Sequence, residues 1–353
     1  MSRKYSEELM NEMRLAMDAP ADEVIAQFFP QRKQELQEKL QGLKHNSDLE
    51  SITDADELFP FVQEILTHAK VDDEILNSSR AFFNTHASDI MLLLGFLSLP
   101  YCYAAANGAQ VLVQSKRILE QPAERLTETA QFVFEVFAKN AFEASGVGLV
   151  SILKVRLMHA ATRWYIQQGP WNKEEFGMPV NQEDMAGTNL SFSLMVVRGL
   201  RKMGKLIKGD DAESFIQYWN AIGKLLGLRE ELLPENNKDA HLLEKTIRGR
   251  QFKESEAGAK LMKSLLSYYE KAAEGSPLEG KVRSMLEFLL GDRVSKMLGI
   301  HLPQTEIQLF KPYTTLLRLQ NQLLKKNDSY NAAWMNFKKQ SEGLVTDNSF
   351  QLP

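Results

Sequence analysis

The chain has 353 residues, and 42 Lys and Arg against 46 Asp and Glu give a formal net charge of −4. This near-neutral balance, with 44% hydrophobic and 25% charged residues, is typical of a globular protein and gives no electrostatic reason to expect nucleic acid or an anionic membrane as a partner. The single cysteine, Cys102, excludes an internal disulfide framework and a cysteine-rich zinc site.

Apolar residues recur at helical spacing along nearly the whole chain, and no alternating run between hairpin dipeptides predicts a sheet. The predicted helices cover residues 6–17, 21–43, 54–69, 122–142, 146–166, 183–203, 212–226, 258–272, 282–298 and 305–324. Pro122 suits a first helical turn, Asp211 is placed to cap the helix that follows it, and Gly227 is placed to end that helix. The pattern predicts an all-α protein.

An uncharged segment, residues 90–113, is long enough to span a bilayer. It also contains Pro100 and several polar residues, so we expect two short helices that meet at Pro100 inside the protein and no stable membrane span. The polar N-terminus lacks the apolar run of a signal peptide, which predicts a cytoplasmic protein. Without a linker or a repeat, the sequence favours one large domain with mobile polar tails at the N-terminus and after about Ser341.

The sequence lacks the motifs of several chemistries that helical proteins support. A carboxylate-bridged di-metal site needs Glu-x-x-His pairs, and none of the six histidines has Glu or Asp three residues before it. The His-Glu-x-x-His zinc motif and the Gly-x-Ser-x-Gly nucleophile motif are absent. Gly146 and Gly148 suggest a dinucleotide loop only weakly, because no predicted strand precedes them. Haem held by one axial histidine remains compatible with the sequence.

His159 is the histidine with the most informative surroundings, since Arg156 lies three residues before it and Arg163 four residues after it. Two guanidinium groups on one helical face oppose protonation of the imidazole, and a neutral imidazole is the form that binds a metal. Two arginines would also suit the two carboxylates of a porphyrin. From spacing alone, the alternative of a hydrogen-bonded core histidine beside surface arginines stays open.

Three segments then suggest a family. Residues 155–160, with Arg156 and His159, resemble the proximal-histidine helix of the latex clearing proteins, which are bacterial rubber oxygenases. Arg125, Glu128 and Thr129 resemble the distal segment of these enzymes, in which Arg is followed three and four residues later by Lys and Thr. Residues 178–188 resemble the Pro-x-Asn-Gln-x-Asp segment of a wider superfamily that includes the endoplasmic-reticulum oxygenase of mycophenolic acid biosynthesis.

The resemblance implies a globin-like helical core with extra helices that binds haem b. His159 would be the iron ligand, Arg156 and Arg163 would help to bind the cofactor, and Arg125, Glu128 and Thr129 would be the catalytic residues of the distal side. The implied reaction uses dioxygen to oxidise or cleave an unsaturated, isoprenoid-like apolar small molecule. The implied domains are residues 1–74, an N-terminal helical segment packing on the core; 75–300, the catalytic domain; and 301–353, C-terminal helices and a polar tail.

Two departures from the family keep other functions open. Glu128 stands where the rubber oxygenases have Lys, and it could ligate iron, act as an acid or base, or leave that position to water. Residues 106–110 hold no carboxylate where a catalytic Glu is expected. The alternatives are a haem- or lipophile-binding helical protein without oxygenase turnover, and a scaffold that has lost the cofactor. The sequence does not indicate an oligomeric state.

The segment around Asn181, Gln182 and Asp184 also allows two interpretations. These side chains suit the cap of the helix predicted to begin near Glu183. One of them could instead accept a hydrogen bond from His159 and so fix its tautomer.

Overall fold

The computed structural model describes residues 3–276, 278–302, 330–342 and 350–353, and within these ranges it contains helices and no β-strand, as predicted. The first helices are α1 (Glu7–Leu15), α2 (Ala19–Phe28), α3 (Lys33–Gly42), α4 (Asn46–Glu50), α5 (Phe59–His68), α6 (Asp73–Leu93), α7 (Leu99–Tyr103), α8 (Ala106–Ser115) and α9 (Arg117–Glu120). Then follow α10 (Pro122–Phe137), α11 (Gly148–Gln167), α12 (Lys173–Phe176), α13 (Gln182–Phe192), α14 (Leu194–Lys202), α15 (Gly209–Leu225), α16 (Asn237–Gln251), α17 (Glu256–Ala272), α18 (Val282–Leu290), α19 (Asp292–Met297) and α21 (Tyr330–Gln340). Short 3-10 turns occupy η1 (Arg3–Tyr5) and η3 (Glu230–Leu232).

Three predicted helices are each divided in two. The helix predicted over 21–43 breaks at a turn containing Pro30, because proline restricts the preceding residue and cannot donate a helical hydrogen bond. The helix predicted over 183–203 breaks at Ser193, and that over 282–298 breaks at Gly291, whose φ of +85° is left-handed. The helix predicted over 305–324 lies entirely outside the described residues.

Capping predictions had mixed outcomes. Pro122 occupies the first turn of α10, and Gly227, with a φ of +85°, follows α15. The assignment of Asp211 as N-cap was wrong, because α15 begins at Gly209 and Asp211 lies in its first turn, where a carboxylate favours the helix dipole. The C-terminal residues 350–353 are docked rather than a loose tail, since Gln37 exchanges hydrogen bonds with the backbone of Phe350 and Leu352.

The uncharged segment 90–113 does not break at Pro100. Instead α6 continues through a π-helical turn, η2 (Leu94–Ser98), into α7, and the chain leaves the helix after Tyr103. The wider π turn accommodates the missing N–H of Pro100 in the second position of α7. By length and composition alone, the run Asp73–Tyr103 is sufficient to cross a membrane, a test that core helices also pass. In this structure it packs against α14, α15 and α17.

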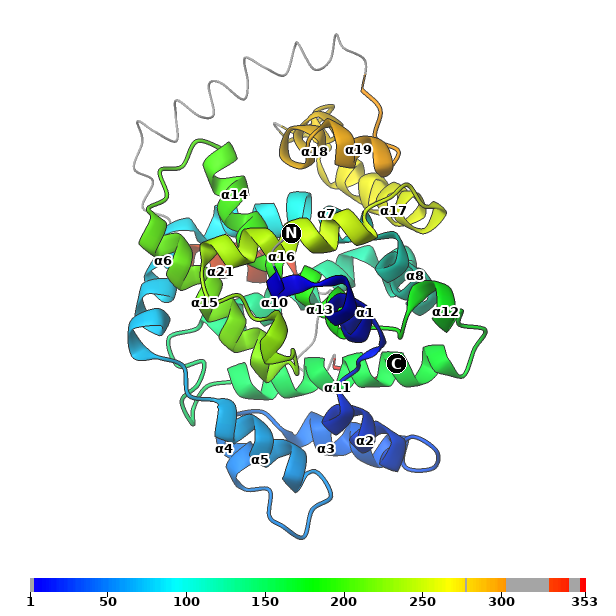
Figure 1. Cartoon of the computed structure of the whole chain (residues 1–353). Coiled ribbons are helices and arrows are strands. Elements are labelled where there is room, and N and C mark those ends of the chain that lie inside the picture. Colours follow the sequence, from blue (N-terminus) through cyan, green and yellow to red (C-terminus); the bar gives the residue numbers. More distant parts are fainter. Residues whose placement is uncertain (1–2, 277, 303–329, 343–349) are drawn as a thin grey trace.

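The long helix α11 is central to the arrangement of the site. Figure 1 shows it crossing the molecule, with α2, α3, α4 and α5 along one side and the larger helical body along the other. It contacts α2 and α5 on the first side and α10 and α8 on the second. The main hydrophobic core includes side chains from both sides of α11, so burial of apolar surface fixes this helix in place.

The start of α11 is fixed by a residue from another part of the chain. The side chain of Asn46 accepts hydrogen bonds from the backbone N–H groups of Leu149 and Val150 and donates to the carbonyls of Ala141 and Glu143. These bonds satisfy N–H groups that no intrahelical carbonyl reaches. A Cβ at Gly146 would lie 1.8 Å from the carbonyl oxygen of Asn140, so this glycine permits a tight turn before α11.

Candidate functional site

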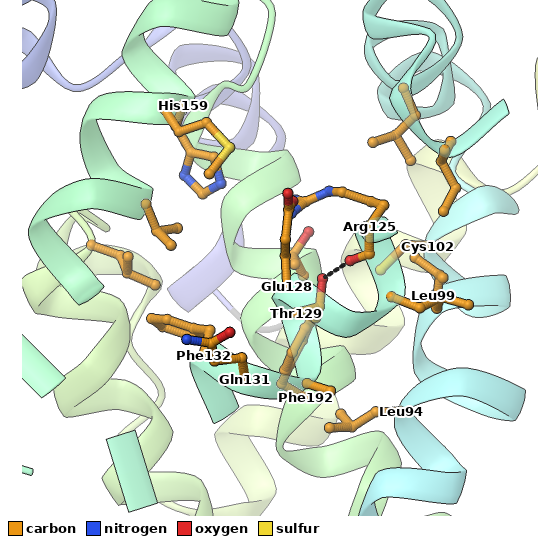
Figure 2. A pocket seen from close by; sticks show the side chains of 18 of the residues that line it. Leu94, Leu99, Cys102, Arg125, Glu128, Thr129, Gln131, Phe132, His159 and Phe192 are labelled. Carbon is orange, nitrogen blue, oxygen red and sulfur yellow. Dashed lines mark hydrogen bonds and ion pairs between the residues drawn. The ribbon is translucent and has the colours of Figure 1, made fainter. Parts of the chain in front are cut away.

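A cavity of about 1690 Å³ lies between α10 and α11 and extends toward α6, α7, α13 and α17. Its wall is mostly apolar and includes Leu99, Phe132, Met158 and Phe192. Figure 2 shows His159 on one side of this space and Arg125, Glu128 and Thr129 on another. The structure therefore brings together four of the residues that the sequence singled out, in a volume large enough for a sizeable apolar ligand.

His159 lies on the cavity wall with its Nδ1 atom buried and without a hydrogen-bond partner among the described residues. Burial, together with the positive charges of Arg163 and Arg125, lowers the pKa of His159 to about 3. The imidazole is consequently neutral at pH 7, which is the form that donates a lone pair to a metal. A buried polar atom without a partner is costly, and a ligand or water in the cavity offers one.

Glu128 faces this histidine's cavity from α10 and is held by two arginines. Arg117 Nη2 donates to Glu128 Oε1 at 2.6 Å, and Arg125 Nη1 lies 3.4 Å from Glu128 Oε2. Burial lowers the pKa of the Arg125 guanidinium, although about a third of the side chain (33%) is accessible. Thr129 Oγ1 donates at 3.0 Å to the backbone oxygen of Arg125, so its hydroxyl hydrogen bonds to its own helix.

Arg156 and Arg163 are not in the cavity wall. Arg156 forms a two-pronged pair with Asp18, the N-cap residue of α2, at 2.7 and 2.8 Å, and a third bond to Glu64 of α5 at 2.9 Å. Arg163 is fully buried and pairs with Asp22 of α2 at 2.6 Å. Arg156, His159 and Arg163 lie within an arc of about 60° on the helix surface, and the boundary between the cavity side and the α2 side falls within that arc.

A second cluster of polar side chains lines the cavity, and the sequence analysis did not identify it. Glu135 of α10 accepts hydrogen bonds from Gln131 at 2.8 Å and from the hydroxyl of Ser151 on α11. Burial raises the pKa of the Glu135 carboxyl. Lys154, one turn after Ser151, also lines the cavity. Glu135 lies two helical turns after Glu128, and this seven-residue spacing is the signal that could have indicated a shared face.

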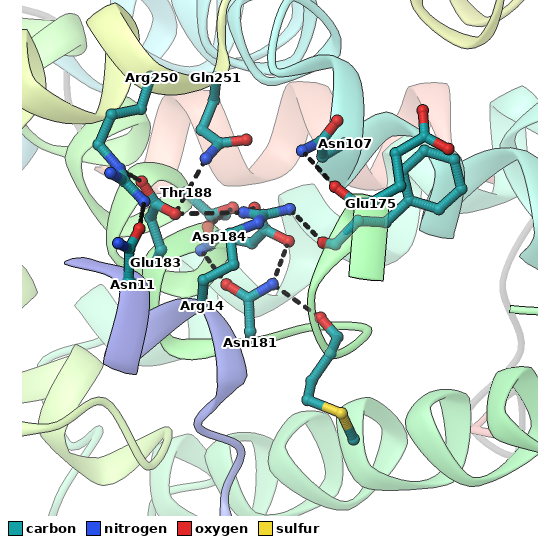
Figure 3. A network of polar contacts seen from close by, with 12 residues as sticks. Asn11, Arg14, Asn107, Glu175, Asn181, Glu183, Asp184, Thr188, Arg250 and Gln251 are labelled. Carbon is teal, nitrogen blue, oxygen red and sulfur yellow. Dashed lines mark hydrogen bonds and ion pairs between the residues drawn. The ribbon is translucent and has the colours of Figure 1, made fainter. Parts of the chain in front are cut away.

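Asn181 caps α13, which confirms one of the two interpretations of its segment. Its side-chain oxygen accepts from the N–H of Asp184 at 3.0 Å, and its amide nitrogen donates to Asp184 and Met178. Figure 3 shows the network around it, in which Arg14 of α1 contacts Asp184. No hydrogen bond from His159 to Asn181, Gln182 or Asp184 exists in this structure. The network thus fastens α1 to α13.

Glu183 forms the buried centre of the same network. Its carboxylate pairs with Arg250 of α16 at 2.8 Å, accepts from Gln251 at 2.9 Å and lies 3.4 Å from Arg14. Because three donors surround a side chain with no exposed surface, the charge is compensated and structural.

Within the described part of the chain, no group of three or more His, Cys, Asp or Glu side chains could hold a metal ion. Cys102 lies in the cavity wall, where burial raises the pKa of its thiol and Ser191 is its hydrogen-bond partner at 3.2 Å. A buried thiol of this kind is unreactive. The cavity therefore offers the neutral imidazole of His159 as a single nitrogen ligand.

Comparison with known proteins gave consistent matches. The sequence model of a family described as "ER-bound oxygenase mpaB/B'/Rubber oxygenase, catalytic domain" matches residues 84–319. A rubber oxygenase from Streptomyces sp. (strain K30) is 24% identical over 249 residues, which span 68% of this chain and 60% of that protein. The structure of latex clearing protein in the closed state superimposes with a TM-score of 0.74 at 19% identity, covering 94% of this chain and 91% of the other.

Proposed function

We propose, from the premise that this chain belongs to the family of the ER-bound oxygenase mpaB/B' and rubber oxygenase catalytic domains, that it is a haem b-dependent oxygenase acting on an apolar, unsaturated small molecule. The observation that carries the proposal is the neutral His159, whose ring lines a large apolar cavity and whose Nδ1 has no partner among the described residues. The domain boundaries at residues 74 and 300 remain predictions.

The cavity fits the proposed cofactor in three respects. It offers one neutral imidazole, apolar side chains for the faces of a porphyrin, and a volume of about 1690 Å³. His159 would hold the iron from α11, and Phe132 and Met158 would help to exclude water from the cavity. Haem iron, when bound, would supply the activation of dioxygen, and this chain would supply the iron ligand, the polarity of the opposite wall and the access route.

On the opposite wall, Arg117 and Arg125 share the charge of Glu128, which leaves one net positive charge at that end of the cavity. Positive charge beside a reacting centre stabilises negative charge that develops on oxygen. In a cleavage of C=C to two carbonyl groups, both oxygen atoms come from dioxygen, so the overall reaction balances without an external reductant. The apolar wall formed by Leu99, Phe132 and Phe192 suits an isoprenoid chain.

The test is the absorption spectrum of purified protein reconstituted with haemin. Wild-type protein should give a Soret band. His159→Ala should lack this band, or show it only when imidazole is added. His241→Ala is a matched control, because His241 is exposed and its ring bonds to a backbone oxygen of its own helix. Failure of the wild-type protein to bind haemin would contradict the proposal.

Turnover distinguishes the oxygenase from a haem- or lipophile-binding protein. The reconstituted protein should consume dioxygen in the presence of squalene and release carbonyl products, and the His159→Ala variant should not. A haem-binding protein that retains squalene without consuming oxygen would be a carrier.

A further inference from the structure

The positively charged side chains that line the cavity differ in what neutralises them. Those in the described part of the wall are Lys44, Arg117, Arg125, Lys154 and Arg248. Arg117 and Arg125 share Glu128, and Arg248 pairs with Glu244 at 2.7 Å. Lys44 is exposed at the rim. Lys154 is the cavity cation that is both half-buried and without an ion pair to any described carboxylate.

Lys154 lies on α11, five residues before His159, and its Nζ donates to the backbone oxygen of Leu43 at 2.9 Å. Its ammonium group also lies 5.6 Å from the centre of the Phe350 ring. Burial and the neighbouring charge of Lys44 lower the pKa of Lys154 to about 8. A half-buried ammonium whose other N–H groups have no acceptor among the described residues is a position that an anion stabilises.

The acidic groups around Lys154 leave this charge incompletely compensated. Asp48, at the start of α4, accepts the backbone N–H groups of Lys44 and His45. Glu135, from α10, is occupied by Gln131 and Ser151, and burial raises the pKa of its carboxyl toward the neutral form. Neither carboxylate lies within ion-pair distance of Lys154. The cavity therefore keeps one cation available on the helix that carries His159.

We propose that Lys154 binds a carboxylate of the porphyrin cofactor. The inference rests on the proposed haem function and assigns to Lys154 the role that the sequence alone suggested for Arg156 and Arg163. Those two arginines already pair with Asp18 and Asp22 on the other side of α11. An ammonium group at the edge of an apolar cavity matches a porphyrin, whose apolar ring carries carboxylates at one edge only.

The experiment compares haemin with haemin dimethyl ester, which lacks the negative charges but keeps the iron and the ring. Spectral titrations would give dissociation constants for wild-type protein, Lys154→Met, Lys154→Arg and the control Lys139→Met. Lys139 is exposed and outside the cavity wall. We expect Lys154→Met to bind haemin about tenfold more weakly, the value of one charge-assisted hydrogen bond. Its affinity for the ester should be unchanged, and Lys154→Arg should restore haemin binding.

Each other outcome overturns the inference in its own way. If Lys154→Met weakened the binding of haemin and of the ester equally, the role of Lys154 would be in packing. Unfolding of the apo-variant, measured by circular dichroism, would lead to the same conclusion. Unchanged haemin affinity would mean that Lys154 makes no such contact. Lys154-dependent binding of dodecanoate to the haem-loaded protein would assign this position to a substrate carboxylate. Absence of haemin binding by the wild-type protein would instead refute the haem function itself.

Discussion

The two sides of α11 differ in the partners that they provide for buried polar side chains. On the α2 side, Arg156 forms a two-pronged pair with Asp18, and the Asp18 and Arg156 side chains are only 2% and 3% exposed. Arg163 pairs with Asp22 through one bond, and its Nη2 atom and Asp22 Oδ2 have no partner among the described residues. On the cavity side, His159 keeps a buried Nδ1 atom without a partner among the described residues. One helix thus carries a compensated ionic contact and an uncompensated imidazole within eight residues.

This difference in partners assigns the α2 side of α11 to folding stability and the cavity side to function. A buried ion pair with good geometry is part of the folded structure, and the removal of one partner leaves an isolated charge. An imidazole that is desolvated and unpaired costs free energy in the apo-protein, and such groups concentrate at binding and catalytic sites. The α2 side should therefore respond to mutation through stability, and the cavity side through ligand binding.

The largest expected effect is on the α2 side. Arg156→Met leaves the Asp18 carboxylate buried and unpaired and should lower the free energy of unfolding by about 3–5 kcal/mol. Urea denaturation of the apo-protein measures this change. Arg32→Met is the matched control, because Arg32 pairs with Glu35 and Glu57 at the surface, where solvent screens the charges, and its loss should change stability far less. Similar losses in the two variants would break the distinction between the two sides.

A medium effect is expected from the pH dependence of the apo-protein. The pKa of His159 is about 3 in the folded state and near 6.5 when unfolded, so only the unfolded state binds this proton between those values. Stability should therefore fall as pH falls from about 6.5, by up to about 1.4 kcal/mol per pH unit from this residue. His159→Phe should reduce that slope. Denaturation midpoints at pH 7.5 and 5.0 test it, and parallel curves for both proteins would contradict it.

The smallest effect on stability is expected at the opposite wall. Glu128→Gln removes a partly exposed ion pair with Arg117 and Arg125 and should change the free energy of unfolding by about 1 kcal/mol or less. Because both arginines hold the carboxylate, we expect the absorption spectrum of the haem-loaded variant to match the wild-type spectrum from pH 6 to 9. A shifted Soret band in the variant would show instead that Glu128 ligates the iron.

The sequence predicted features that depend on local periodicity and on single positions. The all-α class, the position of Pro122 and the role of Gly227 follow from helical spacing and from the backbone preferences of proline and glycine. The breaks at Ser193 and Gly291 were missed, because apolar periodicity continues across them. The polar group of Glu135, Ser151 and Lys154 was missed because it joins two helices whose pairing register the sequence does not state.

The sequence by itself determined that this protein is helical and that His159 is its most informative histidine, because both depend on the order of residues along one helix. Only the tertiary structure decided that His159 faces a cavity while Arg156 and Arg163 face away. The partners Asp18 and Asp22 come from α2, some 140 residues earlier, and the cap of α11 comes from Asn46. Helical period fixes the angle at which a side chain leaves its helix, and long-range packing decides what that side chain meets.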